Sequence, residues 1–503
     1  MTSESRARRR IPAGVVATLL FVAGFVPRLL WISIGPYSVD TLNLALKAEQ
    51  LVTTLQLSYS FGSGYPLTIV CGGFFVLLGK IAGVHDPVLA VNFMSVVMGA
   101  ACVPVLYLLT LRLIDRDTAF FAAFFLSVTP IFLAVSTYGL SHTPALLFLL
   151  AGINFLLRFR DSGRGSDLMI AAAFIGFLGA ARLQNLVLMA VPLAFLLWTV
   201  SGRDRWRTFL VFGSVAAAAM GIFYLPYLIG SERAAYLAQF VKYKEASVIP
   251  DASIGLLFKP LLNILYHLIY TFTPVGIMLI FIGGWKLSKQ HRGPAYLFLM
   301  LWLLFPVLLY SRLYTLVPRF LTILHPPLCI MMAYFFPQNC AAGRFRRILA
   351  MLLAVVMAVG MVCLVEPVLT ARHRQATIPE YVRWVARLAP PDARIITVDD
   401  SLFFRYYSNL NLLSRFHDQY RINEEAHAAF RRELDGLLNS GISVYVTEHG
   451  LYNYDPQGRF AAMMTEGYRL DSVGVRPYEF WQESCWQSGR YPRQLFRVWP
   501  KQQ

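Results

Sequence analysis

Charged residues are scarce in this chain. They make up 15% of its 503 residues, whereas 57% are hydrophobic and the mean hydropathy is +0.54. So little charge excludes an ordinary soluble enzyme. Cysteine is scarce too, and the six cysteines suggest neither a disulfide framework nor a CxxC metal site. Lys and Arg outnumber Asp and Glu by 45 to 28, but they cluster in short loops between apolar runs, which indicates orientation signals rather than nucleic-acid binding.

Long apolar runs dominate the first three quarters of the sequence. A membrane span needs roughly 20 predominantly apolar residues. Twelve runs of this kind occur, at 13–34, 66–82, 88–111, 118–136, 144–158, 168–182, 185–200, 208–229, 262–285, 294–311, 318–336 and 348–368. The basic flank before the first run is not followed by a convincing A-x-A-like cleavage site, so we expect an uncleaved first helix with a cytoplasmic N-terminus.

The loop charges predict how many of these runs cross the membrane. Besides Arg8 to Arg10, four clusters should be cytoplasmic: Arg158/Arg160/Arg164, Arg203/Arg205/Arg207, Lys286/Lys289/Arg292 and Arg344/Arg346/Arg347. All four fall on that side if the run 66–82 dips into the membrane without crossing. That run is short, rich in glycine and preceded by a Gly-Ser-Gly turn, which favours a re-entrant or interfacial helix. The sequence therefore predicts about eleven spans and extracytoplasmic chemistry.

The stretch 35–66 follows the first span and carries the acid Asp40. Polar residues recur there at helical spacing, which predicts a helix along the interface with one polar stripe. The stripe contains Asp40, Asn43, Lys47, Gln50 and Thr54. Asp40 is placed to accept a proton from an attacking hydroxyl. It equally fits a helix N-terminus, where Ser38 would cap and an acid is favourable, so both interpretations stay open.

The tail after about residue 370 changes character. Two short apolar runs, ARIITVDD and ISVYVTEHG, predict buried strands, and the charged stretch between them predicts a helix that ends at Gly441. We expect a transmembrane domain over 1–370 and a small α/β extracytoplasmic domain over 371–503. The tail has no GxGxxG, P-loop or HExxH motif, and Asp399-Asp400 fit a strand-to-turn junction better than a metal site.

The order of these segments resembles the GT-C superfamily of integral-membrane glycosyltransferases, in particular protein O-mannosyltransferases and lipid A aminoarabinose transferases. The resemblance covers nearly the whole chain. It rests on Asp40 soon after the first span, the Pro-led GYPLTIV, the stretch from VPVLYLLTL to GINFLLR that contains SHTP, and then GFLGAARLQN, TFTPVGIML and PRFLTILHPP. It implies a sugar donor on a polyprenyl phosphate, a lipid, glycan or protein acceptor, and Asp40 as catalytic base.

The sequence also departs from that family. Thr41 stands where many relatives have a second acid, and His142 stands where another Asp is frequent, so a divalent-metal site is not supported and we expect no cofactor. Outer cations near span ends are suited to a departing phosphate. The substrate-binding candidates are Arg319, Arg182, His142, Lys47, Arg312 and Tyr65. The structural alternative is that each Arg is an interfacial anchor and that His142 only supports the fold.

Two further functions remain open at this point. One is a polytopic lipid or glycan transporter or flippase, although the chain shows neither repeated halves nor acids deep in several spans. The other is a non-catalytic lipid-binding relative in a glycan-assembly complex. The favoured prediction is an inverting, polyprenyl-phosphate-dependent glycosyltransferase of the cell inner membrane, with its C-terminal domain in the periplasm.

Overall fold

The chain divides into two compact units. The computed structural model describes residues 11–59, 64–202, 204–230, 233–238, 241, 254–290, 293–311, 317–337, 343–398, 400–414, 424–452, 458–479 and 490–501. Residues singled out in the sequence that lie outside these ranges are Arg8 to Arg10, Arg203, Arg292, Arg312 and Asp399. The first unit holds the described residues up to Ile32 and Leu44–Thr370. The second holds Ser33–Asn43 and the described residues after Thr370.

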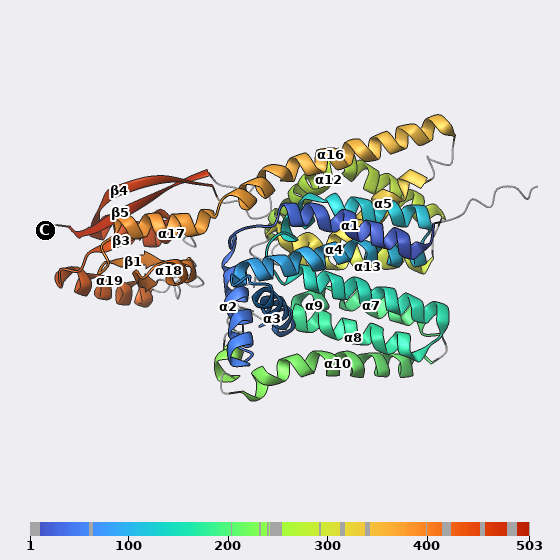
Figure 1. Cartoon of the computed structure of the whole chain (residues 1–503), viewed down its shortest axis with the longest axis horizontal. Helices are drawn as coiled ribbons and strands as arrows, with labels where there is room; N and C mark the ends of the chain where they lie inside the picture. Colours follow the sequence, from blue (N-terminus) through green and yellow to red (C-terminus); the bar gives the residue numbers. More distant parts are fainter. Residues whose placement is uncertain are drawn as a thin grey trace, which may run out of the picture. The chain divides into compact units, whose positions relative to one another are not determined.

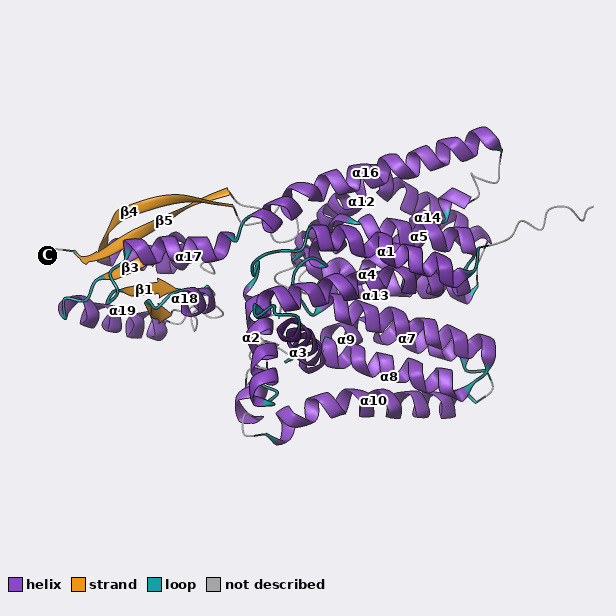
Figure 2. Cartoon of the chain, in the orientation of Figure 1, coloured by secondary structure: helices purple, strands orange, loops and turns teal. Residues whose placement is uncertain are grey.

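Long apolar helices make up most of the first unit (Figures 1 and 2). Eight of the described segments are long and apolar enough to cross a membrane. They are α1 (Ala13–Leu30), α4 (Pro87–Leu113), α7 (His142–Ser162), α9 (Leu183–Val200), α10 (Arg205–Ile229), α12 (Ile254–Gln290), η1 (Pro318–Leu324) continued by α14 (His325–Ala333), and α16 (Arg344–Arg374). The polytopic helical membrane fold predicted from the sequence is confirmed.

Shorter apolar helices occupy the three remaining predicted spans. The helices α8 (Gly165–Ala181) and α13 (Pro294–Tyr310) have 17 residues each. The run 118–136 is divided into α5 (Arg116–Val128) and α6 (Pro130–Val135), because a proline has no N–H with which to continue the helical ladder. Packing places α8 against α7 and α10, α13 against α9, and α5 against α4 and α14. Each predicted span therefore has a helical counterpart in the first unit.

Two helices lie across one end of this bundle instead of along it. They are α2 (Val39–Thr54) and α3 (Pro66–Ile81), and α3 is seen almost end-on in Figure 1. Gly72 and Gly73 let α3 approach α2 closely, because a Cβ atom there would lie 3.1 Å from the Ala48 Cβ and 3.2 Å from a Leu51 methyl carbon, respectively. The short glycine-rich run is thus a helix packed on protein, as the sequence predicts.

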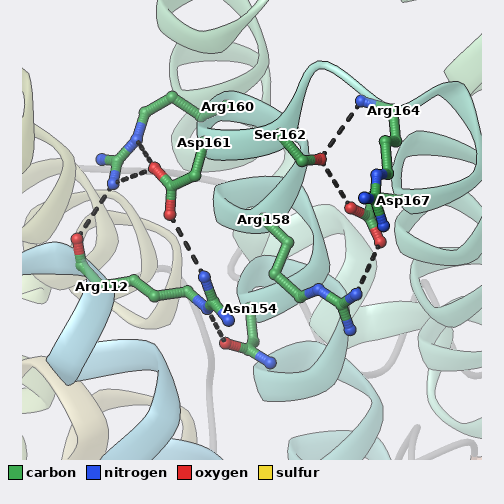
Figure 3. A network of polar contacts seen from close by, with 8 residues as sticks. All are labelled: Arg112, Asn154, Arg158, Arg160, Asp161, Ser162, Arg164 and Asp167. Carbon is green, nitrogen blue, oxygen red and sulfur yellow. Dashed lines mark hydrogen bonds and ion pairs between the residues drawn. The ribbon is translucent and has the colours of Figure 1, made fainter.

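Basic residues gather at the opposite end, where α7 turns into α8 (Figure 3). Arg160 lies 2.9 Å from an Asp161 carboxylate oxygen, and Arg158 lies 3.3 Å from Asp167. From α4, Arg112 also reaches Asp161, at 3.2 Å, and so ties α4 to α7. Part of the positive charge that the sequence assigns to membrane orientation is therefore balanced by acids at the same end.

The second unit contains a five-stranded mixed sheet in the order β2-β1-β3-β5-β4. Its strands are β1 (Arg394–Thr397), β2 (Asn411–Ser414), β3 (Val444–Thr447), β4 (Tyr468–Glu479) and β5 (Arg490–Pro500). Its helices are α17 (Thr377–Leu388), α18 (Ser401–Tyr407), α19 (Glu424–Asn439), α20 (Glu448–Tyr452) and α21 (Arg459–Gly467).

Strand pairing in this sheet changes direction at β3. The strand β1 is parallel to both neighbours, with Ile395 opposite Leu412 in β2 and Tyr445 in β3. The long hairpin of β4 and β5 joins antiparallel through β5. Gly441 follows α19 with φ 77° and donates to the Leu438 carbonyl, as expected for a C-terminal glycine. The predicted α/β fold of the tail is confirmed, while the extracytoplasmic location of residues 371–503 stays a prediction.

Candidate functional site

Four segments that are distant in sequence meet at Arg182 and Phe320, at the end of the first unit where α2 and α3 lie. Tyr65 precedes α3, and His142 opens α7. Arg182 connects α8 to α9, and Arg319 lies beside Phe320 in η1. These five residues are called the cationic cluster below. The cluster unites four of the seven site residues predicted from the sequence.

Phe320 is the centre of the cluster. The Cζ atoms of Arg182 and Arg319 lie 5.3 Å and 6.0 Å from the centroid of its ring. The His142 ring stacks on it with centroids 5.9 Å apart and planes inclined by 19°. On the Phe320 backbone, the carbonyl accepts a 2.7 Å hydrogen bond from the Tyr310 hydroxyl. Guanidinium groups against an aromatic face keep their N–H edges available for a further partner.

Arg182 is held by its backbone and by one side-chain hydrogen bond. It adopts an extended conformation (φ −161°, ψ 94°) between two helices, and its N–H donates to the Leu178 carbonyl at the end of α8. The side chain donates from Nη1 to the Ser141 hydroxyl at 2.8 Å, and its Cζ lies 5.6 Å from the Tyr65 ring. Only 6% of the residue is exposed.

No carboxylate among the described residues lies within ion-pair distance of Arg182. Burying a cation without a counter-ion is unfavourable, and near a bilayer such a cation faces protein or a polar cavity rather than lipid. The surroundings of Arg182 therefore favour an anionic ligand.

His142 is a second buried polar group of the cluster. It is 3% exposed, and neither ring nitrogen has a hydrogen-bond partner among the described residues. The positive charges of Arg182 and Arg319 both act on the ring. Leaving a buried polar group without a partner costs about 1–3 kcal/mol. A ligand oxygen would supply the acceptor that the His142 N–H lacks.

A strained turn holds Tyr65 in the cluster. Tyr65 has φ 50° and Gly64 has φ 92°, so two successive residues adopt left-handed conformations. A Cβ on Gly64 would lie 2.7 Å from the ring of Tyr227, whose hydroxyl donates to the Ser58 and Gly64 carbonyls at 3.2 and 3.4 Å. The Tyr65 hydroxyl accepts a hydrogen bond from Gln184 at 3.3 Å. Strain of this kind persists where the surroundings fix it, and it is frequent at ligand sites.

The remaining predicted residues are placed differently. Lys47 lies in α2, and its Nζ is 3.5 Å from the Gln50 side-chain oxygen. Arg312 lies outside the described residues. Asp40 is in the first turn of α2 and belongs to the second unit, whereas the cationic cluster belongs to the first.

The N-terminus of α2 has the cap that the sequence suggests. Ser38 Oγ accepts the Thr41 N–H at 3.2 Å and lies 3.0 Å from the Thr41 hydroxyl. A hydroxyl cap and an acid in the first turn both stabilise a helix N-terminus. The helix therefore begins as the structural interpretation of Asp40 expects, while its role as base stays a prediction.

Sequence reasoning missed three residues of interest. Phe320 and Ser141 directly adjoin the predicted Arg319 and His142, which was the available signal. Arg28 in α1 is fully buried and donates from Nη1 to the Gly24 and Ser127 carbonyls at 2.8 and 3.3 Å. Ser127 lies just before the break between α5 and α6, so Arg28 satisfies a carbonyl near an interrupted helical ladder, which is a structural task.

A divalent cation does not fit the described residues. Mg²⁺ and Mn²⁺ prefer several oxygen ligands. No three His, Cys, Asp or Glu side chains in the described ranges lie close enough together to hold a metal ion. The cationic cluster itself presents mainly hydrogen-bond donors and positive charge, which do not suit a metal cation.

Comparisons with known proteins agree with this architecture. Residues 74–230 match the family described as dolichyl-phosphate-mannose-protein mannosyltransferase. ArnT from Cupriavidus metallidurans, in a crystal structure bound to undecaprenyl phosphate, is similar with a TM-score of 0.60 and 12% identity, over 96% of this chain and 97% of that chain. The chain has the GT-C glycosyltransferase fold. No curated protein matches its sequence.

Other structures with the GT-C fold are similar over most of this chain. The archaeal oligosaccharyltransferase AglB from Archaeoglobus fulgidus, in complex with an inhibitory peptide and a dolichol-phosphate, has a TM-score of 0.60 and 14% identity, over 94% of this chain and 74% of that chain. The arabinofuranosyltransferase AftD from Mycobacteria has a TM-score of 0.50 and 15% identity, over 97% of this chain and 40% of that chain. The resemblance inferred from Asp40, SHTP and PRFLTILHPP is confirmed at the level of the GT-C fold.

Proposed function

We propose that this protein transfers a sugar from a polyprenyl-phosphate donor to an acceptor outside the cytoplasm. The observation that supports this most directly is the cationic cluster. There the buried Arg182 guanidinium and the His142 imidazole face the Phe320 ring, and the imidazole nitrogens have no hydrogen-bond partner among the described residues. Similar GT-C structures contain undecaprenyl phosphate and dolichol-phosphate. Both are isoprenoid phosphates, whose headgroup suits two guanidinium groups and an imidazole N–H.

In this proposal, the cationic cluster binds the donor headgroup. Arg182 and Arg319 neutralise the phosphate, and a planar guanidinium matches phosphate oxygens with two parallel N–H groups. His142 donates an N–H to a donor oxygen. Tyr65 packs on the guanidinium of Arg182 and restricts its movement. Lys47 and Arg312 are proposed as additional cations for the substrate.

Asp40 is proposed as the base toward the acceptor. Its carboxylate takes the proton of the acceptor hydroxyl while the hydroxyl oxygen attacks the anomeric carbon. The bond between that carbon and the phosphate oxygen breaks in the same step, and the phosphate departs with the electron pair. A single displacement of this kind inverts the anomeric configuration. Because a bound phosphate is already a good leaving group, one carboxylate suffices.

The proposed orientation follows the charges of the first unit. The basic clusters, with the turn between α7 and α8 among them, are placed in the cytoplasm together with the N-terminus. The opposite end, with α2, α3 and the cationic cluster, then faces the outside, and residues 371–503 form a periplasmic domain. The proposed compartment is the cell inner membrane.

Mass spectrometry of the lipid that copurifies with the protein tests this function. We expect a polyprenyl phosphate in the wild type, and a larger fraction of it carrying a sugar in Asp40→Asn, because donor still binds but is not consumed. Glu49→Gln is the matched control, since Glu49 is another acid of α2 and lies 3.8 Å from Lys80.

This experiment tests the donor class and the role of Asp40 separately. Sugar-carrying lipid that accumulates in Asp40→Asn and not in Glu49→Gln supports both the donor class and the base. If sugar-carrying lipid does not accumulate in Asp40→Asn, the role of Asp40 as base is contradicted. A protein that carries no polyprenyl phosphate in any variant, even when lipid is extracted directly from membranes, contradicts the donor class and favours the transport or scaffold function.

A further inference from the structure

The segment just before Asp40 folds with the second unit, although it lies more than 300 residues before it in the sequence. The Ile34 N–H donates to the Arg372 carbonyl at 3.2 Å. The Tyr37 hydroxyl donates to the same carbonyl at 3.3 Å and also to the Gln375 carbonyl. The Arg372 guanidinium lies 5.7 Å from the centroid of the Tyr37 ring. Backbone and side chain therefore both attach this segment to the end of α16.

This attachment is buried and closely packed. Tyr37 is 2% exposed and Arg372 is fully buried. Burial raises the pKa of Tyr37, so its hydroxyl stays a hydrogen-bond donor at neutral pH. A Cβ on Gly35 would lie 3.9 Å from the Ala376 Cβ. The single proton of the hydroxyl is shared between the Arg372 and Gln375 carbonyls, a polar contact that apolar packing alone would not supply.

Tyr37 is linked to Asp40 by a short stretch of chain. Ser38 follows Tyr37 and caps α2 through the Thr41 N–H. Asp40 is the second residue of α2, so only the capping turn separates it from the attached ring. The helix then continues without interruption through Leu44, where the first unit resumes. A shift of Tyr37 would thus be transmitted to the Asp40 carboxylate.

We propose that Tyr37 and Arg372 are positioning residues for Asp40, so that the second unit holds the base of the transfer reaction in place. This inference rests on the proposed function, in which Asp40 is that base. Neither Tyr37 nor Arg372 touches the substrate. Loosening the attachment should therefore slow transfer without weakening binding of the lipid phosphate.

Tyr37→Phe is the direct test, because it removes the hydroxyl with its hydrogen bonds to the Arg372 and Gln375 carbonyls and keeps the ring. We expect amide hydrogen exchange at Ile34 and over residues 37–44 to become at least tenfold faster. We also expect the sugar-carrying fraction of the copurified polyprenyl phosphate to rise toward its value in Asp40→Asn, with unchanged affinity for undecaprenyl phosphate added as a probe. Tyr445→Phe, which alters a buried tyrosine in β3 of the same unit, is the control and should change neither readout.

An engineered disulfide makes the test independent of folding losses. The distance between the Gly35 and Ala376 Cβ positions lies within the range of natural disulfides, about 3.5–4.5 Å. In a Tyr37→Phe chain that also carries Gly35→Cys and Ala376→Cys, oxidation should restore slow exchange and return the lipid ratio toward the wild-type value. Reduction should reverse both effects, and the Gly35→Cys single variant should respond to neither treatment.

Three results would overturn the inference. Unchanged amide exchange in Tyr37→Phe would show that the Tyr37 hydroxyl does not hold the segment on the second unit. Faster exchange with a wild-type lipid ratio, while Asp40→Asn accumulates loaded lipid, shows that the attachment does not act on the base. If Asp40→Asn accumulates no loaded lipid, the proposed base is wrong and the positioning role falls with it. Exchange then still reports separately whether the segment is held by the second unit.

Discussion

The two ends of the first unit use arginine in different ways. At the turn between α7 and α8, Arg158 and Arg160 have carboxylate partners at 3.3 Å and 2.9 Å, in Asp167 and Asp161 (Figure 3). At the other end, Arg182 is 6% exposed and contacts a hydroxyl and two aromatic rings, with no carboxylate partner among the described residues. Arginines in one bundle thus face opposite electrostatic conditions.

This difference separates structural cations from those proposed to bind a ligand. A paired arginine has its charge balanced by the protein and gains little from a further anion. An arginine that is buried without a carboxylate remains unfavourable until an anion arrives. We therefore expect substitutions at the cluster end to change ligand binding, and substitutions at the paired end to change stability.

The largest expected effect is on lipid-phosphate binding in Arg182→Gln. Losing one charge-assisted interaction costs about 1.5–3 kcal/mol, which corresponds to roughly a 10–100-fold loss of affinity for undecaprenyl phosphate. Titration of the detergent-solubilised protein measures this affinity. Arg158→Gln, which changes the same residue type at the paired end, should bind normally. Equal affinity in a folded Arg182→Gln protein would remove Arg182 from the site.

The next effect concerns stability at the paired end. The Asp167 side chain is 5% exposed and interacts with Arg158 and with the Ser162 hydroxyl, which donates to it at 2.8 Å. Asp167→Asn keeps the size but loses the charge, and should lower the free energy of unfolding by about 1.5 kcal/mol. Thermal unfolding in detergent checks this. If Asp167→Asn unfolds normally but binds lipid phosphate poorly, ligand binding would belong to the turn between α7 and α8 and not to the cationic cluster.

Arg319→Ala should weaken lipid-phosphate binding about tenfold, close to the lower limit for a charge-assisted hydrogen bond. Arg319 is only half-buried, with its Cζ 6.0 Å from the Phe320 ring, so removing it should leave the thermal unfolding midpoint nearly unchanged. Binding and unfolding are measured on the same preparation. A lower midpoint with normal binding would make Arg319 a structural anchor.

The smallest effect is expected for His142→Phe. Phenylalanine keeps the stack on Phe320 and removes two buried nitrogens that lack partners among the described residues. Stability should therefore rise by about 1 kcal/mol, while affinity for lipid phosphate falls severalfold. Such opposite changes in unfolding and binding are not expected from a purely structural histidine. If both quantities fall together, His142 belongs to the packing of α7 and not to the site.

Local features of the sequence predicted much of the architecture. Apolar runs and loop charges indicated the helices of the first unit. The glycines before and within 66–82 indicated that α3 packs on protein, and the short apolar run around residues 394–398 indicated the buried strand β1. Hydrogen bonds within a helix and the burial of a short apolar run depend on neighbouring residues, so a single sequence carries this information.

The candidate site was predictable only as a set of residues. Polar groups beside span ends were recognisable, namely Arg182, His142, Arg319 and Tyr65. Spacing gives no reason for them to gather in one cluster with Phe320. Their meeting depends on how four separate helix ends pack, which involves residues far apart in the chain. Arg28 was missed for the same reason, since nothing near it in sequence indicates the Ser127 carbonyl that it satisfies.

The sequence by itself determined that this protein is a polytopic helical membrane protein with a small α/β tail, because composition and periodicity are local properties. Only the tertiary structure decided which cations share a ring and which are paired with acids. It also decided that Tyr37, which the sequence places beside the first span, folds with Arg372. These arrangements depend on long-range packing, in which burial energy selects partners that the order of residues does not specify.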